Sequence, residues 1–125
     1  MIKALLAGVG LAVGISGAAS AQDAAAGEKV FAKCKACHVI EAATNRVGPS
    51  LHGIIGRTAG TVEGFKYSES MIQHGKDGLV WNNENLDKYL ADPKGFIPKN
   101  KMAFPGLKKA EDRANVIAYI DEASK

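Results

Sequence analysis

The sequence predicts an all-α fold of three to five short helices joined by long loops. No segment of the 125-residue chain keeps the strict alternation of apolar and polar residues that is typical of a half-buried strand. Short stretches with helical spacing are instead separated by glycine, proline and asparagine. Two loops, 39–65 and 95–106, are long, and long loops in a compact domain need a function or a partner. We therefore expect something other than side chains to complete the core.

The first residues differ in kind from the rest of the chain. One lysine precedes an apolar run over 4–15, and an A-x-A cleavage pattern follows at 19–21. This pattern is typical of a secretory signal peptide, and the run is shorter than the roughly 20 residues that a membrane-spanning helix needs. An uncleaved anchor is the alternative. We expect cleavage of the signal peptide 1–21, which leaves one domain, 22–125, as a periplasmic monomer without membrane insertion.

The composition limits the classes of partner. The formal net charge is +3, and it falls by one if Lys3 is removed with the signal peptide. A charge this small does not suggest a nucleic-acid partner. Export to an oxidising compartment would also allow the two cysteines to form a disulfide.

The first helix is expected over 23–35. Asp23 can cap its start, because an aspartate side chain accepts hydrogen bonds from the free N–H groups of the first turn. Val30, Phe31 and Cys34 then fall on one face at helical spacing. This face is expected to be buried.

Two shorter helices are expected in the middle of the chain, after a loop with a turn near 50–54. The stretch "SESMIQHG" has Ser68 to cap its start and Gly75 to stop it. The stretch "NNENLDKYLADP" begins with asparagines that can cap a helix and ends at Pro93, which cannot continue one. The segment 95–106 is again irregular.

The chain closes with a helix over "KKAEDRANVIAYIDEAS". Its apolar side is a stripe with Val116 beside it, and the stripe consists of Ala110, Ala114, Ile117 and Ile120.

The two cysteines of the chain lie in "CKACH", residues 34–38, with a histidine directly after the second. On a helical turn, positions i, i+3 and i+4 share a face, so Cys34, Cys37 and His38 point the same way. C-x-x-C-H is the signature of covalent haem attachment. The thiols form thioethers with the porphyrin vinyl groups, and the histidine offers a nitrogen to the iron. One covalently bound haem c per chain would supply the missing core.

Three alternatives fit the motif less well. A redox motif of thioredoxin type needs a βαβ setting, which the pattern does not offer. A zinc site needs four ligands, and His52 and His74 do not stand at paired spacing. A plain disulfide between Cys34 and Cys37 would leave the adjacent His38 unexplained.

A second axial ligand is expected from a methionine. A thioether is a soft neutral donor, and His/Met ligation raises the reduction potential of haem. Met102 lies in "FIPKNKMAFPG", an extended proline-bounded loop that can reach the opposite face of the haem. Met71 lies in an expected helix, where packing is its ordinary role. The pattern favours Met102, with His52 and His74 as the remaining alternatives.

With these motifs, the sequence closely resembles class I cytochrome c, in particular the soluble bacterial periplasmic type related to the mitochondrial protein. The resemblance covers residues 23–124, and it rests on "AAGEKVF", "CKACH", "VGPSLHGIIGR", "GFKYS", "LVW", "LDKYLADPKGFIP", "KMAFPG" and "EDRANVIAYI". It implies the small class I cytochrome c fold, in which long loops wrap around one covalently bound haem and the N- and C-terminal helices pack together. Met71 departs from the family pattern, since the mitochondrial proteins usually carry an asparagine there.

The resemblance also implies roles in the haem pocket. The Pro49 carbonyl matches the acceptor for the other ring N–H of the haem-ligating histidine. Arg57, Tyr67 and Trp81 match residues that hydrogen-bond the haem propionates, which agrees with the cost of burying a carboxylate without donors. Tyr89 matches the tyrosine near the methionine sulfur. The ordinary alternatives are core packing for Trp81 and Tyr89 and a solvated charge for Arg57.

Gly27 and Phe31 match the positions where the N-terminal helix packs against the C-terminal one. Val116 and Tyr119 are expected opposite them, because a glycine lets two helix backbones come close.

With both axial positions filled, the iron has no open site for a substrate. The implied function is that of a soluble electron carrier rather than an enzyme, and a haem enzyme or gas sensor with a displaced Met102 is the alternative. The expected donor is a quinol–cytochrome c oxidoreductase, and the other partners are a terminal oxidase, a photosynthetic reaction centre or a dehydrogenase. A positive face would orient the protein toward such partners. The lysines expected to form this face, with a merely solvated surface as the alternative, are Lys33, Lys35, Lys94, Lys99, Lys101, Lys108 and Lys109.

Overall fold

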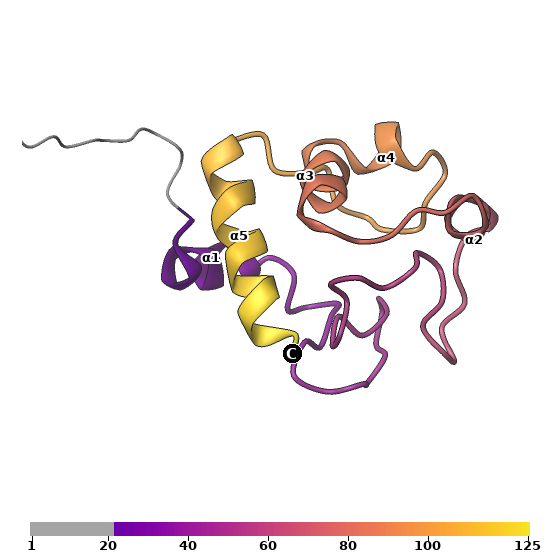
Figure 1. The fold of residues 1–125 in the computed structure, drawn as a ribbon, viewed down its shortest axis with the longest axis horizontal. Coiled ribbons are helices and arrows are strands. Elements are labelled where there is room, and N and C mark those ends of the chain that lie inside the picture. The colour runs from indigo at the N-terminus through magenta and orange to yellow at the C-terminus, as the bar shows by residue number, and fades with distance from the viewer. Residues whose placement is uncertain (1–21) are drawn as a thin grey trace, which may run out of the picture.

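The computed structural model describes residues 22–125, and the predicted signal peptide, 1–21, lies outside the described residues. The described chain forms five helices, which are α1 (Ala24–Phe31), α2 (Glu69–Lys76), α3 (Asn83–Ala91), α4 (Pro93–Phe96) and α5 (Ala110–Ala123). Figure 1 shows α1 and α5 crossing at one end of the molecule and α2 at the other, with α3 and α4 between them. In the described part of the chain, the β-structure is a single bridge between Thr58 and Val80. The predicted all-α fold is confirmed.

None of the helices in residues 22–125 has both the length and the apolar character to cross a bilayer.

The predicted packing of the N-terminal helix on the C-terminal helix is confirmed. α1 and α5 form the most extensive contact between helices of the described chain. A Cβ atom at Gly27 would overlap the Asn115 carbonyl, so only glycine allows this close approach. The ring centroids of Phe31 and Tyr119 lie 5.2 Å apart. The Asn115 side chain also accepts a hydrogen bond of 2.9 Å from the Asp23 N–H, which joins the start of α1 to the middle of α5.

The first helix is shorter than the sequence predicts. Asp23 caps α1 as expected, with Oδ1 accepting from two N–H groups, but the α-helix ends at Phe31. The following residues make i→i−3 bonds, among them Cys34 N–H to the Phe31 carbonyl at 2.7 Å. Such bonds tighten the chain into turns of 3₁₀ type. The cysteine motif therefore lies on turns after the helix, not within it.

Gly75 does not stop α2, so this prediction was wrong. Ser68 caps the helix as expected, accepting from Met71 N–H at 3.0 Å, but α2 continues to Lys76. A Cβ atom at Gly75 would overlap the Ala59 carbonyl, so this glycine serves a close approach between backbones. The chain turns away at Gly78, whose φ of +100° favours glycine.

α3 follows the prediction, and α4 was missed. The Asn82 side chain caps α3, accepting from Asn85 N–H at 2.8 Å, and the helix ends before Pro93. Pro93 then begins α4, because proline suits the first helical position. The Asp92 carboxylate caps this turn by accepting from Gly95 N–H at 3.1 Å.

α5 lies within its predicted range, but its buried side differs in part. Ile117 and Ile120 are buried as expected, whereas Ala110 is exposed at the first turn. Asn115, which the sequence analysis did not single out, is buried instead because it faces α1.

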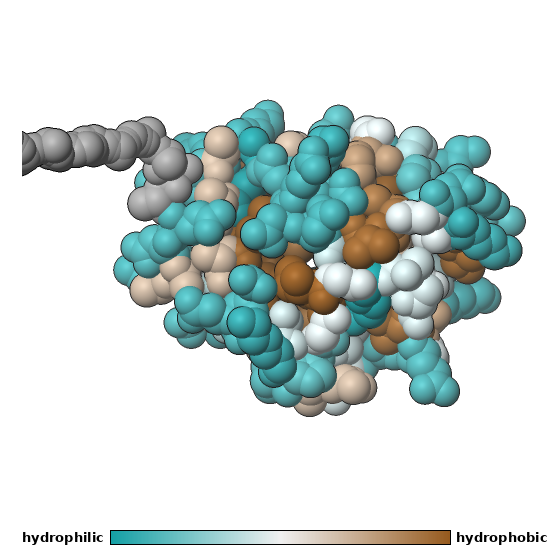
Figure 2. All heavy atoms as spheres, viewed as in Figure 1, coloured by the Kyte–Doolittle hydropathy of each residue, from teal (hydrophilic) through white to brown (hydrophobic). Residues whose placement is uncertain are grey.

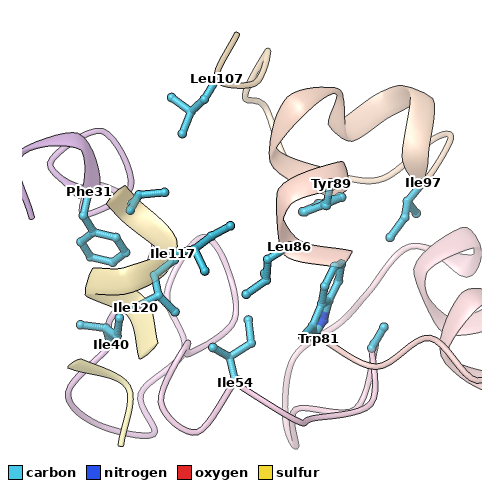
Figure 3. Close-up of a cluster of buried hydrophobic side chains, with 12 residues drawn as sticks. Phe31, Ile40, Ile54, Trp81, Leu86, Tyr89, Ile97, Leu107, Ile117 and Ile120 are labelled. Carbon is cyan, nitrogen blue, oxygen red and sulfur yellow. The ribbon is translucent and has the colours of Figure 1, made fainter. Parts of the chain in front are cut away.

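The buried apolar side chains surround the middle of the molecule. Figure 3 shows Phe31, Ile117 and Ile120 on the side of α1 and α5, and Leu86 and Tyr89 on the side of α3. The core is thus divided between two walls, and the space between them is the site described next.

Candidate haem site

A cavity of about 250 Å³ lies between the two walls, and both cysteines border it. Figure 2 shows apolar side chains gathered near the middle of one face, with hydrophilic side chains around them. The predicted haem residues that line the cavity are Cys34, Cys37, His38, Pro49, Arg57, Tyr67, Trp81, Tyr89 and Met102. These residues come from α3 and from three loops between helices, so the tertiary fold brings the whole predicted set to one place.

His38 is oriented by the backbone. Its Nδ1 lies 2.8 Å from the Pro49 carbonyl, which can only accept, so Nδ1 carries the proton and Nε2 is left with a free lone pair. Burial lowers the pKa of His38 despite the bond to Pro49, and Arg57 lowers it further. The imidazole is therefore held neutral, in the form that binds a metal.

Gly48 leaves the space in which the His38 ring lies. A Cβ atom there would overlap the ring and would lie 2.8 Å from Nδ1 and 2.9 Å from Nε2. The position therefore requires glycine because of a close approach, although its backbone conformation is ordinary.

Cys34 and Cys37 form no disulfide with each other. The Cys37 and His38 N–H groups both donate to the Cys34 carbonyl, at 3.1 and 3.0 Å. This local turn gives the three side chains the common side that the spacing predicts. Burial, and to a smaller extent Cys37, raise the pKa of the Cys34 thiol to about 11, while Lys33 lowers it.

Met102 also lines this cavity. The Tyr89 hydroxyl donates to Met102 Sδ at 3.9 Å, and burial raises the pKa of Tyr89 to about 12. The phenol thus stays a donor at neutral pH. Met71 from α2 also borders the cavity, so two thioethers are available there.

Arg57, Tyr67 and Trp81 bring polar groups to the same cavity. The Arg57 guanidinium donates to the carbonyls of Ser50 and His52, at 3.0 and 3.1 Å. The Tyr67 hydroxyl accepts from Val62 N–H at 3.0 Å, so its own proton is free to donate. Burial lowers the pKa of Arg57 and raises that of Tyr67.

The two other histidines lie outside the cavity lining. His52 Nδ1 lies 3.3 Å from the Ile40 carbonyl, and His74 Nδ1 lies 2.8 Å from the Ser70 carbonyl. This arrangement disfavours both as alternatives to Met102.

The seven predicted docking lysines are all exposed. Lys33 and Lys101 border the haem cavity itself. The Lys94 ammonium, in contrast, is bound to oxygen atoms of the Met102 loop. Asn100, which was not predicted from the sequence, also lines the cavity and is 5% exposed. The sequence did contain a signal for this residue, because it lies two residues before the methionine in a proline-bounded loop.

The donor set fits a covalently bound haem. Two thiols and an imidazole stand on one turn, and the Met102 thioether, apolar side chains and Arg57 line the same cavity. Cys34 and Cys37 would hold the porphyrin through thioethers, and the bound group would supply a reversible one-electron couple.

The chain was compared with known proteins. The sequence profile of the cytochrome c family matches residues 24–124. The chain is 59% identical over 90 residues to cytochrome c2 iso-2 of Magnetospirillum fulvum, which covers 72% of this chain and 91% of that protein. It is 48% identical over 99 residues to cytochrome c 2.1 of Caenorhabditis elegans, covering 78% and 86% of the two chains.

A solved structure of a related protein has the same fold. The fold is similar to that of ferricytochrome c2 from Rhodopseudomonas palustris, with a TM-score of 0.75 and 40% identity over 81% of this chain and 98% of that chain.

The chain belongs to the cytochrome c family. It is a single-haem electron carrier of the cytochrome c2 type, an electron-transfer protein rather than an enzyme. Its covalent haem c is attached through Cys34 and Cys37.

Proposed function

We propose that His38 and Met102 are the axial ligands of the haem iron. The observation that carries this proposal is that both side chains line one cavity with the two cysteines, with His38 Nδ1 bonded to Pro49. The Nε2 lone pair and the Met102 thioether are then the donors, and Tyr89 lies beside the sulfur. With both axial positions filled, no substrate binds the iron, and the protein exchanges electrons with a partner at its surface.

Three residues hold the haem propionates in this proposal. Tyr67 has a hydroxyl proton free to donate, and Trp81 has an indole N–H. The third, Arg57, supplies positive charge in the lining of the same cavity. The donors offset the cost of burying carboxylates.

The exposed lysines form the docking face. Lys33 and Lys101 border the cavity, and Lys35, Lys94, Lys99, Lys108 and Lys109 complete the set. We propose that this face meets acidic surfaces on a quinol–cytochrome c oxidoreductase as donor, and on a terminal oxidase, photosynthetic reaction centre or dehydrogenase as the other partner. Charge complementarity would speed the encounter without a long-lived complex. We also propose that residues 1–21 direct export to the periplasm and are removed there.

The axial ligands are tested by spectroscopy of the exported holoprotein. A pyridine haemochrome assay should give one haem per chain, and the ferric form should show the weak sulfur-to-iron absorption band. Met102→Ala should abolish the band. Met71→Ala is the matched control, because it removes the other thioether of the same cavity and should leave the band in place. Loss of the band in Met71→Ala alone would assign the ligand to Met71.

Docking is tested by the rate of reduction by membranes that contain the quinol-oxidising complex. The rate should fall steeply with ionic strength and with lysine substitution at the cavity edge, because exposed charges are screened by salt. Lys33→Ala should slow it more than Lys29→Ala on α1, a lysine outside the proposed face. A rate that is independent of salt would show that the lysines are only a solvated surface. The mass of the exported protein tests the signal peptide, and a chain that begins at Gln22 is expected.

A further inference from the structure

The loop that carries Met102 is held mainly by side chains. Its backbone bonds to the rest of the chain include Asn100 N–H to the Ile97 carbonyl at 3.2 Å and Leu107 N–H to the Leu90 carbonyl at 2.7 Å. Met102 lies between these two points. The N–H and the carbonyl of Met102 instead bond to two different side chains, Asn100 and Lys94.

Asn100 uses its whole side-chain amide in this arrangement. Nδ2 donates to the carbonyls of Pro93 and Ile97, both at 2.9 Å. Oδ1 accepts from Met102 N–H at 2.8 Å and from the Lys94 ammonium at 3.3 Å. Two donors and two acceptor positions are thus all occupied in a residue that is 5% exposed. The amide ties the methionine to the short helix α4.

The exposed Lys94 side chain adds further hydrogen bonds to the Met102 loop. Its ammonium donates to the Asn100 carbonyl at 2.7 Å and to the Met102 carbonyl at 3.0 Å, besides Asn100 Oδ1. The three donors of the ammonium are matched by three oxygen atoms of the loop. Lys101, in the same loop, makes one bond of 3.3 Å, to the Lys66 carbonyl. Lys94 and Lys101, two lysines of the proposed docking face, therefore differ in their attachment.

We propose that Lys94 and Asn100 are positioning residues that keep the Met102 thioether in the haem cavity. They do not touch the iron; they act by holding both peptide groups of Met102. This proposal rests on the proposed ligation of iron by Met102. Opening of the loop is the step that they oppose, so they set how readily an added ligand replaces the methionine.

The test uses imidazole as the added ligand and the ferric holoprotein. Because imidazole binds only when the loop has opened, its apparent dissociation constant is the intrinsic one divided by the open fraction. Loss of hydrogen bonds from a partly exposed charged group should raise the open fraction about threefold to tenfold in Lys94→Ala. Asn100→Ala should raise it at least as much, with a weaker sulfur-to-iron band. Lys101→Ala is the matched control, since it removes an equal charge at the residue directly before Met102.

A double-variant cycle separates the positioning role from a general loss of stability. Because Lys94 bonds to Asn100 through two oxygen atoms, the two substitutions should be non-additive in imidazole affinity. The same affinity in Lys94→Ala as in the wild type, or an equal change in Lys101→Ala, would overturn the proposal. If the wild type lacks the sulfur-to-iron band, or keeps it in Met102→Ala, the ligation by Met102 fails, and the positioning role fails with it. If the band depends on Met102 but Lys94→Ala leaves imidazole binding unchanged, only the positioning role fails.

Discussion

The two sides of the haem cavity differ in the hydrogen bonds next to the two proposed axial ligands. On the His38 side, the residues near the histidine form backbone–backbone bonds, as in Gly48 N–H to the Cys37 carbonyl and Leu51 N–H to the Val39 carbonyl, both at 2.8 Å, and the side chains of Ser50 and Arg57 add further bonds. At Met102, the N–H and the carbonyl instead bond to the side chains of Asn100 and Lys94, and the Arg113 side chain holds the end of the loop.

This difference bears on how firmly each side is held. A backbone bond survives most substitutions, whereas a side-chain bond is lost with one residue and costs the rotamer freedom of a long side chain. The His38 side also adjoins the covalent attachment and the contact between α1 and α5. We infer that the His38 side is the fixed half of the site and the Met102 side the adjustable half.

The largest effect is expected from removing the covalent attachment. In a double variant, Cys34→Ala with Cys37→Ala, haem should no longer stay with the chain under denaturing conditions. Most of the helical circular dichroism should also be lost, since too little core remains in so small a domain. A compact double variant that melts cooperatively without haem would show that the two walls do not need the group between them.

Gly48→Ala, which acts on the His38 side, should have the next largest effect. The new methyl group would overlap the imidazole ring, and we expect the free energy of unfolding to fall by about 2–3 kcal/mol. Denaturant unfolding of the holoprotein measures this change. Thr44→Ala is the control in the same loop, at an exposed position outside the cavity lining, and its effect should stay within about 0.5 kcal/mol. Equal effects at both positions would argue against a tightly built His38 side.

Arg113 offers a smaller test on the Met102 side. Its guanidinium donates to the carbonyls of Leu107 and Lys108, at 2.8 and 3.1 Å, and to the Asp87 carboxylate at 2.7 Å. Arg113→Ala should lower the free energy of unfolding by about 1–2 kcal/mol. It should also raise the apparent affinity for imidazole, because the end of the loop is released.

Asp87→Asn is the control for Arg113. It removes the ion pair, in which the Asp87 side chain is 48% exposed, but leaves the bonds from Arg113 to the loop carbonyls. Exposed ion pairs contribute little, so imidazole binding should not change. If Asp87→Asn matches Arg113→Ala, the ion pair, and not the bonds to the loop, holds this end.

The smallest effect is a pH dependence at Tyr67. Burial raises the pKa of its phenol above the usual value, so the folded state is favoured while the phenol is protonated. This stabilisation is complete below the unfolded value of about 10 and is lost as the pH rises above it. As the pH rises above about 10, the wild type should therefore lose stability relative to Tyr67→Phe. Parallel curves for the two proteins would mean that Tyr67 titrates alike in the folded and unfolded chains.

Local sequence was sufficient for much of this molecule. The attachment motif needs only five consecutive residues, and the caps at Asp23, Ser68 and Asn82 follow from each residue's own side chain. Met102 was favoured over Met71 by its proline-bounded loop, and the structure brings both to the cavity. Ligation by Met102, and the contacts of Arg57 and its neighbours with haem, stay predictions.

Other features were decided by tertiary contact. Gly75 is spaced like a helix stop, but its role depends on Ala59, sixteen positions earlier. Nothing in the sequence distinguishes Lys94 from other surface lysines. Only the folded loop places three oxygen atoms around its ammonium. The spacing of residues along the chain determines which side chains share one side of a turn, because residues that are close in sequence are also close in space. The partner of a glycine or an ammonium across the molecule is set only when the long loops close, so the chain alone did not reveal it.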